Sequence, residues 1–98
     1  MVKFEWDPVK DAANRRKHGI SFEEASSLFR NPDGWLERID ELHGDDEDRF
    51  AAIGLITRGV ATVVYVERDE DVIRLVSARF ATRREIRMYD AWVRRRKA

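Results

Sequence analysis

The 98-residue sequence contains no cysteine, only two prolines and five glycines. Without cysteine the chain can form neither disulfides nor thiolate metal sites, so a hydrophobic core must hold it together. The sequence also lacks an apolar run of about 20 residues and an apolar N-terminal region, which predicts neither a membrane span nor a signal peptide. We therefore expect a single domain over residues 1–98 that works in the cytoplasm.

Charge is balanced over the whole chain but unevenly distributed along it. Nineteen basic residues match nineteen acidic ones, so the formal net charge is zero. Between residues 79 and 98, however, eight basic residues stand against two acidic ones, and most of the compensating acid lies between residues 40 and 48. This segregation fits a surface for a polyanion, and it fits equally well a solvated helix face beside a solvated loop.

Hydrophobic periodicity and capping signals divide the chain into eight elements. Strands are predicted at residues 2–6, 35–39, 49–57, 60–68 and 72–79, and helices at residues 8–18, 22–29 and 83–96. Short turns join the last three strands, so we expect these to be antiparallel neighbours. The order β-α-α-β-β-β-β-α predicts an α+β domain with a mainly antiparallel sheet and helices packed on it.

Local signals mark the ends of the helices. Asp7 is a favoured N-cap before the first helix, Gly19 ends that helix, and Val9 is expected on its buried side together with Ala12 and Ala13. Ser and Thr followed three residues later by Glu form a capping box, the signature of a helix N-terminus. Two such boxes are present: Ser21 with Glu24, and Thr82 with Glu85.

The second capping box lies where the strand at residues 72–79 runs into the last helix. Four arginines, which we expect to be unpaired, surround this junction: Arg79, Arg83, Arg84 and Arg87. Guanidinium groups and the free N–H groups of a helix N-terminus both bind phosphate oxygens. The junction is therefore a candidate anion site.

Proton transfer at such a site would need other residues, because arginine stays charged at any ordinary pH. The candidates are Lys17, His18 and Tyr89. Histidine ionises near neutral pH and is the best proton carrier of the three, although His18 also fits a simple helix C-cap. Tyr89 shares a helix stripe with apolar residues, so it fits the core unless its hydroxyl emerges at an edge. Arg49 could pair with the acidic segment or point across the sheet toward Arg79.

Other charged groups are weaker candidates for a functional site. His43 and the acidic residues 45–48 lie in a predicted loop. The acidic run lacks the alternating ligands and the glycine of a calcium loop, so we interpret it as solvated surface. We predict neither a metal site nor a cofactor.

The chain resembles the BrnT toxins of bacterial type II toxin-antitoxin systems. Four segments carry the resemblance, in order along nearly the whole chain: Phe4 to Pro8, Asn14 to Ala25, Arg49 with Gly54, and Ser77 to Glu85. One position departs from the pattern. Relatives often have lysine after the serine-alanine-arginine triplet, where this chain has Phe80, so any role of that cation is lost or moved.

The resemblance implies a RelE-like fold and a metal-independent endoribonuclease that arrests translation. A BrnA-type antitoxin with a ribbon-helix-helix part would neutralise it, and the toxin would reach operator DNA only through that partner. Arg49, Arg79 and Arg83 would stabilise charge on the RNA phosphate. Lys17 or His18 would act as base or acid, Tyr89 as acid or stacking platform, and Arg84 and Arg87 would bind RNA.

Two other functions also fit the basic C-terminal helix. The domain could bind RNA or DNA without cleaving it, and salt-dependent binding without cleavage would favour that reading. It could instead be a protein-interaction module whose helix docks an acidic partner, with no measurable affinity for RNA.

Overall fold

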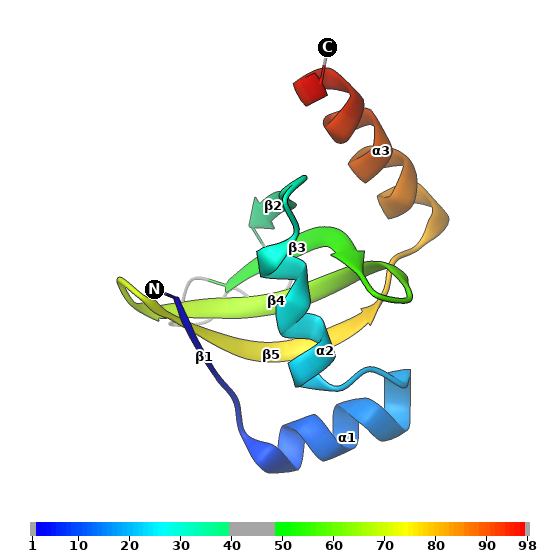
Figure 1. Cartoon of the computed structure of the whole chain (residues 1–98). Coiled ribbons are helices and arrows are strands. Elements are labelled where there is room, and N and C mark those ends of the chain that lie inside the picture. The colour runs from blue at the N-terminus through cyan, green and yellow to red at the C-terminus, as the bar shows by residue number, and fades with distance from the viewer. Residues whose placement is uncertain (1, 40–48, 98) are drawn as a thin grey trace.

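The structure, a computed structural model, describes residues 2–39 and 49–97. It is an α+β domain, as predicted, with three α-helices, one short 3₁₀ helix and a five-stranded sheet (Figure 1). Its elements are β1 (Lys3–Glu5), α1 (Pro8–His18), α2 (Phe22–Ser26), η1 (Ser27–Arg30), β2 (Leu36–Ile39), β3 (Arg49–Ile56), β4 (Gly59–Asp69), β5 (Val72–Phe80) and α3 (Arg83–Lys97). His43 and residues 45–48 lie outside the described residues.

The sheet is mixed, with strand order β1-β5-β4-β3-β2. β1 runs parallel to β5, whereas the other three pairs are antiparallel. Parallel neighbours need a long crossover, and here α1, α2 and three strands separate β1 from β5 in the sequence. None of the described helices has the length and apolarity needed to cross a bilayer.

The predicted caps of α1 are confirmed. The Asp7 carboxylate accepts a hydrogen bond of 2.8 Å from the Val9 N–H, and Pro8 opens the helix, where a missing N–H costs nothing. Gly19 ends the helix with φ of 73°, a left-handed conformation that a side chain would disfavour. The chain therefore turns sharply from α1 into α2.

The predicted buried side of α1 is wrong for two of its three residues. Val9 is 74% exposed and Ala13 is exposed, while Ala12 is half-buried and the buried residue is Asn14. The Asn14 amide donates to the Ala78 carbonyl at 2.9 Å and to the Ile20 carbonyl at 2.8 Å, and its oxygen accepts from the Ala78 N–H at 3.0 Å. β1 pairs with β5 only near the start of β5, so the Asn14 side chain replaces the missing strand partner further along that edge.

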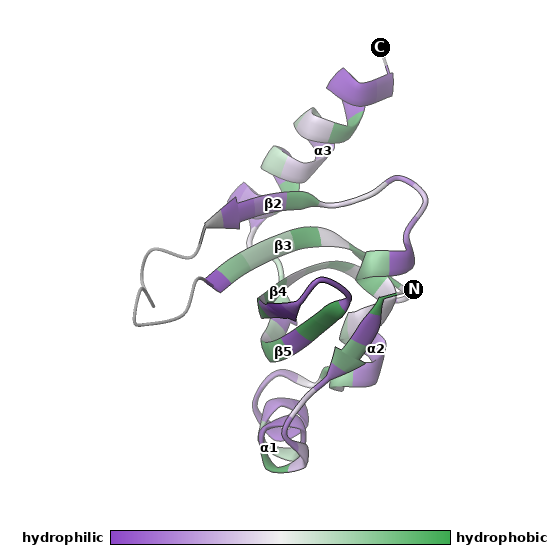
Figure 2. Ribbon diagram, turned by 90° about the vertical axis from the view of Figure 1, so that its left-hand side faces the viewer, coloured by the Kyte–Doolittle hydropathy of each residue, from purple (hydrophilic) through white to green (hydrophobic). Residues whose placement is uncertain are grey.

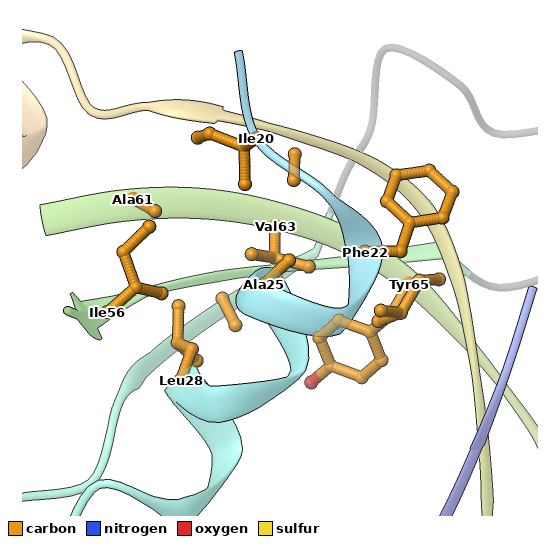
Figure 3. Close-up of a cluster of buried hydrophobic side chains, with 11 residues drawn as sticks. Ile20, Phe22, Ala25, Leu28, Ile56, Ala61, Val63 and Tyr65 are labelled. Atoms are coloured by element: carbon orange, nitrogen blue, oxygen red, sulfur yellow. The ribbon is translucent and has the colours of Figure 1, made fainter. Parts of the chain in front are cut away.

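The main core lies between α2 with η1 and one face of the sheet (Figure 3). Phe22, Ala25 and Leu28 are fully buried in this core, in which α2 contacts β5 and η1 contacts β3. Gly54 lies next to Leu28, and a Cβ at this position would stand 3.0 Å from the Leu28 side chain and 3.1 Å from that of Trp35. The close approach of η1 to β3 therefore requires glycine.

α3 is attached differently. It rises from the end of β5 and projects away from the sheet, at the opposite end of the molecule from α1 (Figures 1 and 2). Tyr89 is its buried residue, and the Tyr89 hydroxyl accepts a hydrogen bond of 3.3 Å from the Asn31 amide. Much of the α3 surface is therefore available to ligands or partners.

Candidate functional site

The site is built on the face of the sheet that points away from α2. In the register of β4 and β5, Val63 pairs with Ala78 and Thr62 pairs with Arg79. Side chains alternate between the two faces of a strand, and Val63 and Ala78 belong to the core. Thr62 and Arg79 therefore project from the opposite face, beside the start of α3.

Glu85 connects these residues to the helix N-terminus. Arg79 Nη1 and Nη2 donate to the two Glu85 carboxylate oxygens at 2.8 and 2.9 Å. The Thr62 hydroxyl and the Thr82 N–H donate to Glu85 Oε1 at 3.1 and 2.9 Å. The Glu85 N–H donates in return to the Thr82 hydroxyl at 3.2 Å, which completes the predicted capping box.

This network fixes the charge state of the pair. The hydrogen bonds from Arg79 lower the pKa of Glu85 to about 2, and the carboxylate in turn raises the pKa of Arg79. The expectation that all four junction arginines are unpaired is therefore wrong for Arg79. The Arg79 side chain is nevertheless 42% exposed, so a positioned guanidinium still presents part of its surface to an anion.

The other three arginines of the junction are exposed: Arg83, Arg84 and Arg87. Within residues 2–39 and 49–97, none of them makes a hydrogen bond or an ion pair with another side chain. Arg83 and Arg84 are the first two residues of α3, where backbone N–H groups have no partner within the helix. The start of α3 therefore carries arginines that form no ion pair with a described carboxylate.

Arg49 lies on the same face of the sheet but at some distance. It pairs in register with Val66, four residues along β4 from Thr62, which corresponds to about 13 Å. The side chain is half-buried, and its Nε is buried without a hydrogen-bond partner among the described atoms. Arg49 and Arg79 thus share a face without contact, while the alternative pairing with the acidic segment falls outside the described residues.

Lys17 and His18 form the last two positions of α1, at the edge of the sheet beside β5. Lys17 is exposed and His18 is half-buried. In the part of the chain that the structure describes, no hydrogen bond or ion pair joins either residue to the Arg79–Glu85 pair. The structure therefore leaves both side chains available but does not bring them together with Arg79.

Tyr89 lies in a buried position, with 3% of its surface exposed. Its ring centroid is 6.0 Å from that of Trp92, and burial raises the pKa of its hydroxyl. In this arrangement Tyr89 offers no free ring face on which an RNA base could stack.

Sequence reasoning missed Arg58, which lies in the turn between β3 and β4. Its guanidinium donates two hydrogen bonds to the Glu24 carboxylate, at 2.6 and 2.8 Å, and one of 2.6 Å to the Gly19 carbonyl. It also lies 5.3 Å from the centre of the exposed Phe80 ring. The Arg58 guanidinium therefore lies beside Phe80, the position where the resemblance leads one to expect lysine. Arg58 and Phe80 are far apart in the sequence, so only the fold shows that they are neighbours.

The described residues contain no cluster of three or more histidine, cysteine, aspartate or glutamate side chains that could hold a metal ion. The metal-independent mechanism remains a prediction.

Comparison with known proteins identifies the family. A family model described as "Ribonuclease toxin, BrnT, of type II toxin-antitoxin system" matches residues 6–85, which include the β5–α3 junction up to Glu85. The chain belongs to the BrnT family. Proteins of this family are ribonuclease toxins, and a type II system implies an antitoxin partner for the toxin.

A solved structure supports the fold of this BrnT-family chain. The chain is similar to the crystal structure of the Brucella abortus ribonuclease toxin, BrnT, with a TM-score of 0.62 and 22% sequence identity. The alignment covers 85% of this chain and all of the Brucella chain. No curated protein matches the sequence.

Proposed function

We propose that this chain is the toxin of a type II toxin-antitoxin system and acts as a metal-independent endoribonuclease that arrests translation. The observation that supports the proposal is the Arg79 guanidinium, which is held by the two hydrogen bonds that it donates to Glu85 yet stays partly exposed. A charged donor held in place before the substrate arrives stabilises charge that develops on a phosphate without a cost of reorganisation.

The reaction needs one proton acceptor and one proton donor. A base removes the proton from the ribose 2'-hydroxyl, whose oxygen attacks the adjacent phosphorus. The bond from phosphorus to the 5'-oxygen then breaks, and an acid protonates that leaving oxygen. The products are a 2',3'-cyclic phosphate and a 5'-hydroxyl, and no oxidant, metal or cofactor enters this balance.

The side chains take different parts in this reaction. Arg79 and Arg83 neutralise the phosphorane, and Arg49 holds a phosphate further along the same face of the sheet. His18 and Lys17 are the proton carriers, approaching from the end of α1. Tyr89, which is buried in the free protein, can act as acid only after α3 shifts.

Arg84 and Arg87 complete the RNA-binding surface along α3. The partner in this proposal is a BrnA-type antitoxin with a ribbon-helix-helix part, through which alone the toxin contacts operator DNA. The relation to RelE-type ribonucleases and the cytoplasmic location belong to the same proposal. They rest on the resemblance to the BrnT toxins rather than on any one contact.

The test is cleavage of end-labelled single-stranded RNA by the purified chain in the presence of a chelator. We expect cleavage to persist and Arg79→Ala to lower its rate by about 100-fold or more. His18→Ala should lower the rate by a similar factor if it transfers a proton. Arg30→Ala provides a matched control, because Arg30 is exposed on η1 away from the junction.

The alternatives give different outcomes. Salt-dependent RNA binding by folded, partner-free protein without any cleavage would identify a non-catalytic nucleic-acid-binding module. Full activity of Arg79→Ala would remove this residue from the mechanism. Loss of cleavage in the chelator, restored by a divalent ion, would overturn the metal-independent chemistry.

A further inference from the structure

A groove separates α3 from the edge of the sheet. β2 is the last strand of the sheet, and a groove of about 500 Å³ lies between it and α3. Its floor consists of four apolar side chains: Leu36 from β2, and Met88, Ala91 and Trp92 from α3. Arg38 reaches across from β2, and its Nη1 lies 3.9 Å from the sulfur of Met88 on α3, so the two walls of the groove are in contact at this point.

The helical wall of the groove follows a single face of α3. Its lining positions are 84, 87, 88, 91, 92 and 95, which succeed one another at the spacing of helix neighbours. The eleven residue-to-residue steps from position 84 to position 95 correspond to about 16 Å along the helix axis. The groove therefore matches about three turns of a second helix laid beside α3.

The rim of the groove is strongly basic. Four of the eight lining residues are arginines, Arg38, Arg84, Arg87 and Arg95, and none of the eight is acidic. An apolar floor between basic rims is complementary to a helix that carries an apolar stripe flanked by carboxylates.

We propose that this groove docks an acidic amphipathic helix of a partner protein, and that the antitoxin of the system supplies this helix. The identification of the partner as the antitoxin rests on the proposed function, since the toxin-antitoxin family implies such a partner. The docking of an acidic amphipathic helix rests on the shape and charge of the groove alone.

The floor of the groove favours a protein occupant over RNA. Aliphatic side chains pack well against Leu36, Met88 and Ala91, whereas RNA needs free aromatic faces to stack its bases. The Trp92 ring is already occupied, since the Arg96 guanidinium lies over it at 4.6 Å and Tyr89 lies beside it.

The location of the groove explains how docking would neutralise the toxin. Arg84 and Arg87 line the groove and also extend the positive surface at the β5–α3 junction. A helix whose carboxylates pair with them would remove two cations from the RNA surface and put negative charge beside Arg79. Docking and RNA binding would therefore compete.

The docking site is tested by titrating the isotope-labelled full chain with a synthetic helical peptide of about 15 residues. The peptide carries leucines at helical spacing flanked by glutamates, and a second peptide has lysines in place of the glutamates. We expect the glutamate peptide to shift the resonances of Leu36, Met88, Ala91 and the Trp92 indole, and the lysine peptide to shift none of them.

A matched pair of variants locates the binding. In Arg38→Glu with Arg95→Glu, affinity for the glutamate peptide should fall about tenfold or more. Arg30→Glu with Arg94→Glu changes the net charge equally at exposed residues outside the groove and should leave affinity unchanged. In cells, the groove variant should remain toxic in the presence of the antitoxin, while the control variant is neutralised.

Each part of the proposal can fail separately. Equal peptide binding by the groove variant, or no shift at the groove floor, would overturn the docking site even if the protein cleaves RNA. Shifts at the groove floor caused by single-stranded RNA but not by the glutamate peptide would assign the groove to RNA. If the chain binds the peptide at the groove but cleaves no RNA, the docking proposal stands and the proposed ribonuclease activity is refuted.

Discussion

α1 and α3 are attached to the same strand, β5, by different kinds of interaction. α1 is held on β5 by neutral groups, because the Asn14 amide pairs with the backbone of Ala78 and the chain that follows buries Ile20 and Phe22. The Arg58–Glu24 ion pair lies beyond the end of α1 and joins α2 to the β3–β4 turn rather than to β5. α3 is held at its start by the ion pair of Arg79 with Glu85. The neutral attachment belongs to the core, whereas the charged one lies beside the candidate site.

The difference separates folding from function along β5. Neutral hydrogen bonds and apolar contacts respond little to pH or salt, so the α1 end should stay closed under conditions that weaken ion pairs. The α3 end combines a partly exposed ion pair with an exposed basic surface, and this is where a charged ligand or partner can act. Substitutions at the two ends test whether the neutral attachment of α1 and the charged attachment of α3 differ in this way.

The largest effect is expected for Asn14→Ala. The substitution leaves the N–H and C=O of Ala78 and the carbonyl of Ile20 without their partner. Unsatisfied buried backbone groups are costly, so we expect the free energy of unfolding to fall by about 3 kcal/mol, measured by urea denaturation. The comparable substitution Asn31→Ala removes the contact with Tyr89 on the α3 side and should cost about 1 kcal/mol. If both variants lost a similar free energy of unfolding, the attachments of α1 and α3 would not differ as described.

The second effect concerns packing on the α2 side. Gly54→Ala places a methyl group within about 3 Å of the Leu28 and Trp35 side chains. Overpacking of a rigid core should lower the free energy of unfolding by about 1 to 3 kcal/mol. Leu55→Ala, at the neighbouring and partly exposed position, should have a smaller effect and serves as the control. Thermal unfolding measures both, and an unchanged midpoint for Gly54→Ala would show that η1 can move away from β3.

Much of the fold follows from local signals in the sequence. The caps at Asp7 and Gly19 and the box at Thr82 and Glu85 act within a few residues, so their outcome does not depend on distant parts of the chain. The strands from residue 49 onward are joined by tight turns, which fix antiparallel pairing locally.

Contacts between residues that are distant in the sequence could not be predicted, because no local sequence signal indicates them. Asn14 is buried because β5, 64 residues away, leaves an unpaired edge beside it. Ser21 caps α2 as expected, because its hydroxyl accepts from the Glu24 N–H at 3.0 Å, but the Glu24 carboxylate binds Arg58 from a distant turn. Arg79 was expected to be free, but it binds the capping glutamate Glu85, because the start of α3 lies beside the face of the sheet from which Arg79 projects.

The third effect is a change in pH dependence in Glu85→Gln. Glu85 has a pKa of about 2 in the folded protein, below its usual value of 4.5, so its carboxylate contributes stability above pH 4.5 that is lost as the pH falls toward 2. Glutamine cannot titrate. The variant should therefore be less stable by about 1 to 2 kcal/mol at neutral pH, a range reduced by the partial exposure of Arg79, and the gap should close in acid.

Hydrogen exchange of the backbone amides locates this loss. In the wild-type protein, acid should first release protection at the start of α3, while the amides of α1 and of β5 near Ala78 remain protected. Simultaneous loss of protection at both ends would contradict the view that, of the two attachments to β5, only that of α3 depends on charge. A gap between wild type and Glu85→Gln that widens in acid would contradict the assigned direction of the pKa shift.

The smallest effect is expected for Arg96→Ala near the C-terminal end of α3. Arg96 lies over the Trp92 ring at 4.6 Å and donates a hydrogen bond of 2.6 Å to the Asp33 carbonyl. Such contacts contribute little at an exposed position, so the free energy of unfolding should fall by about 0.5 kcal/mol. Arg94→Ala removes an exposed arginine that does not contact this ring and controls for the loss of charge. Tryptophan fluorescence should change only in Arg96→Ala, because uncovering Trp92 alters the surroundings of the indole. A loss as large as that of Asn14→Ala would mean that α3 is held along its whole length, and that the groove beside it is part of the folding core.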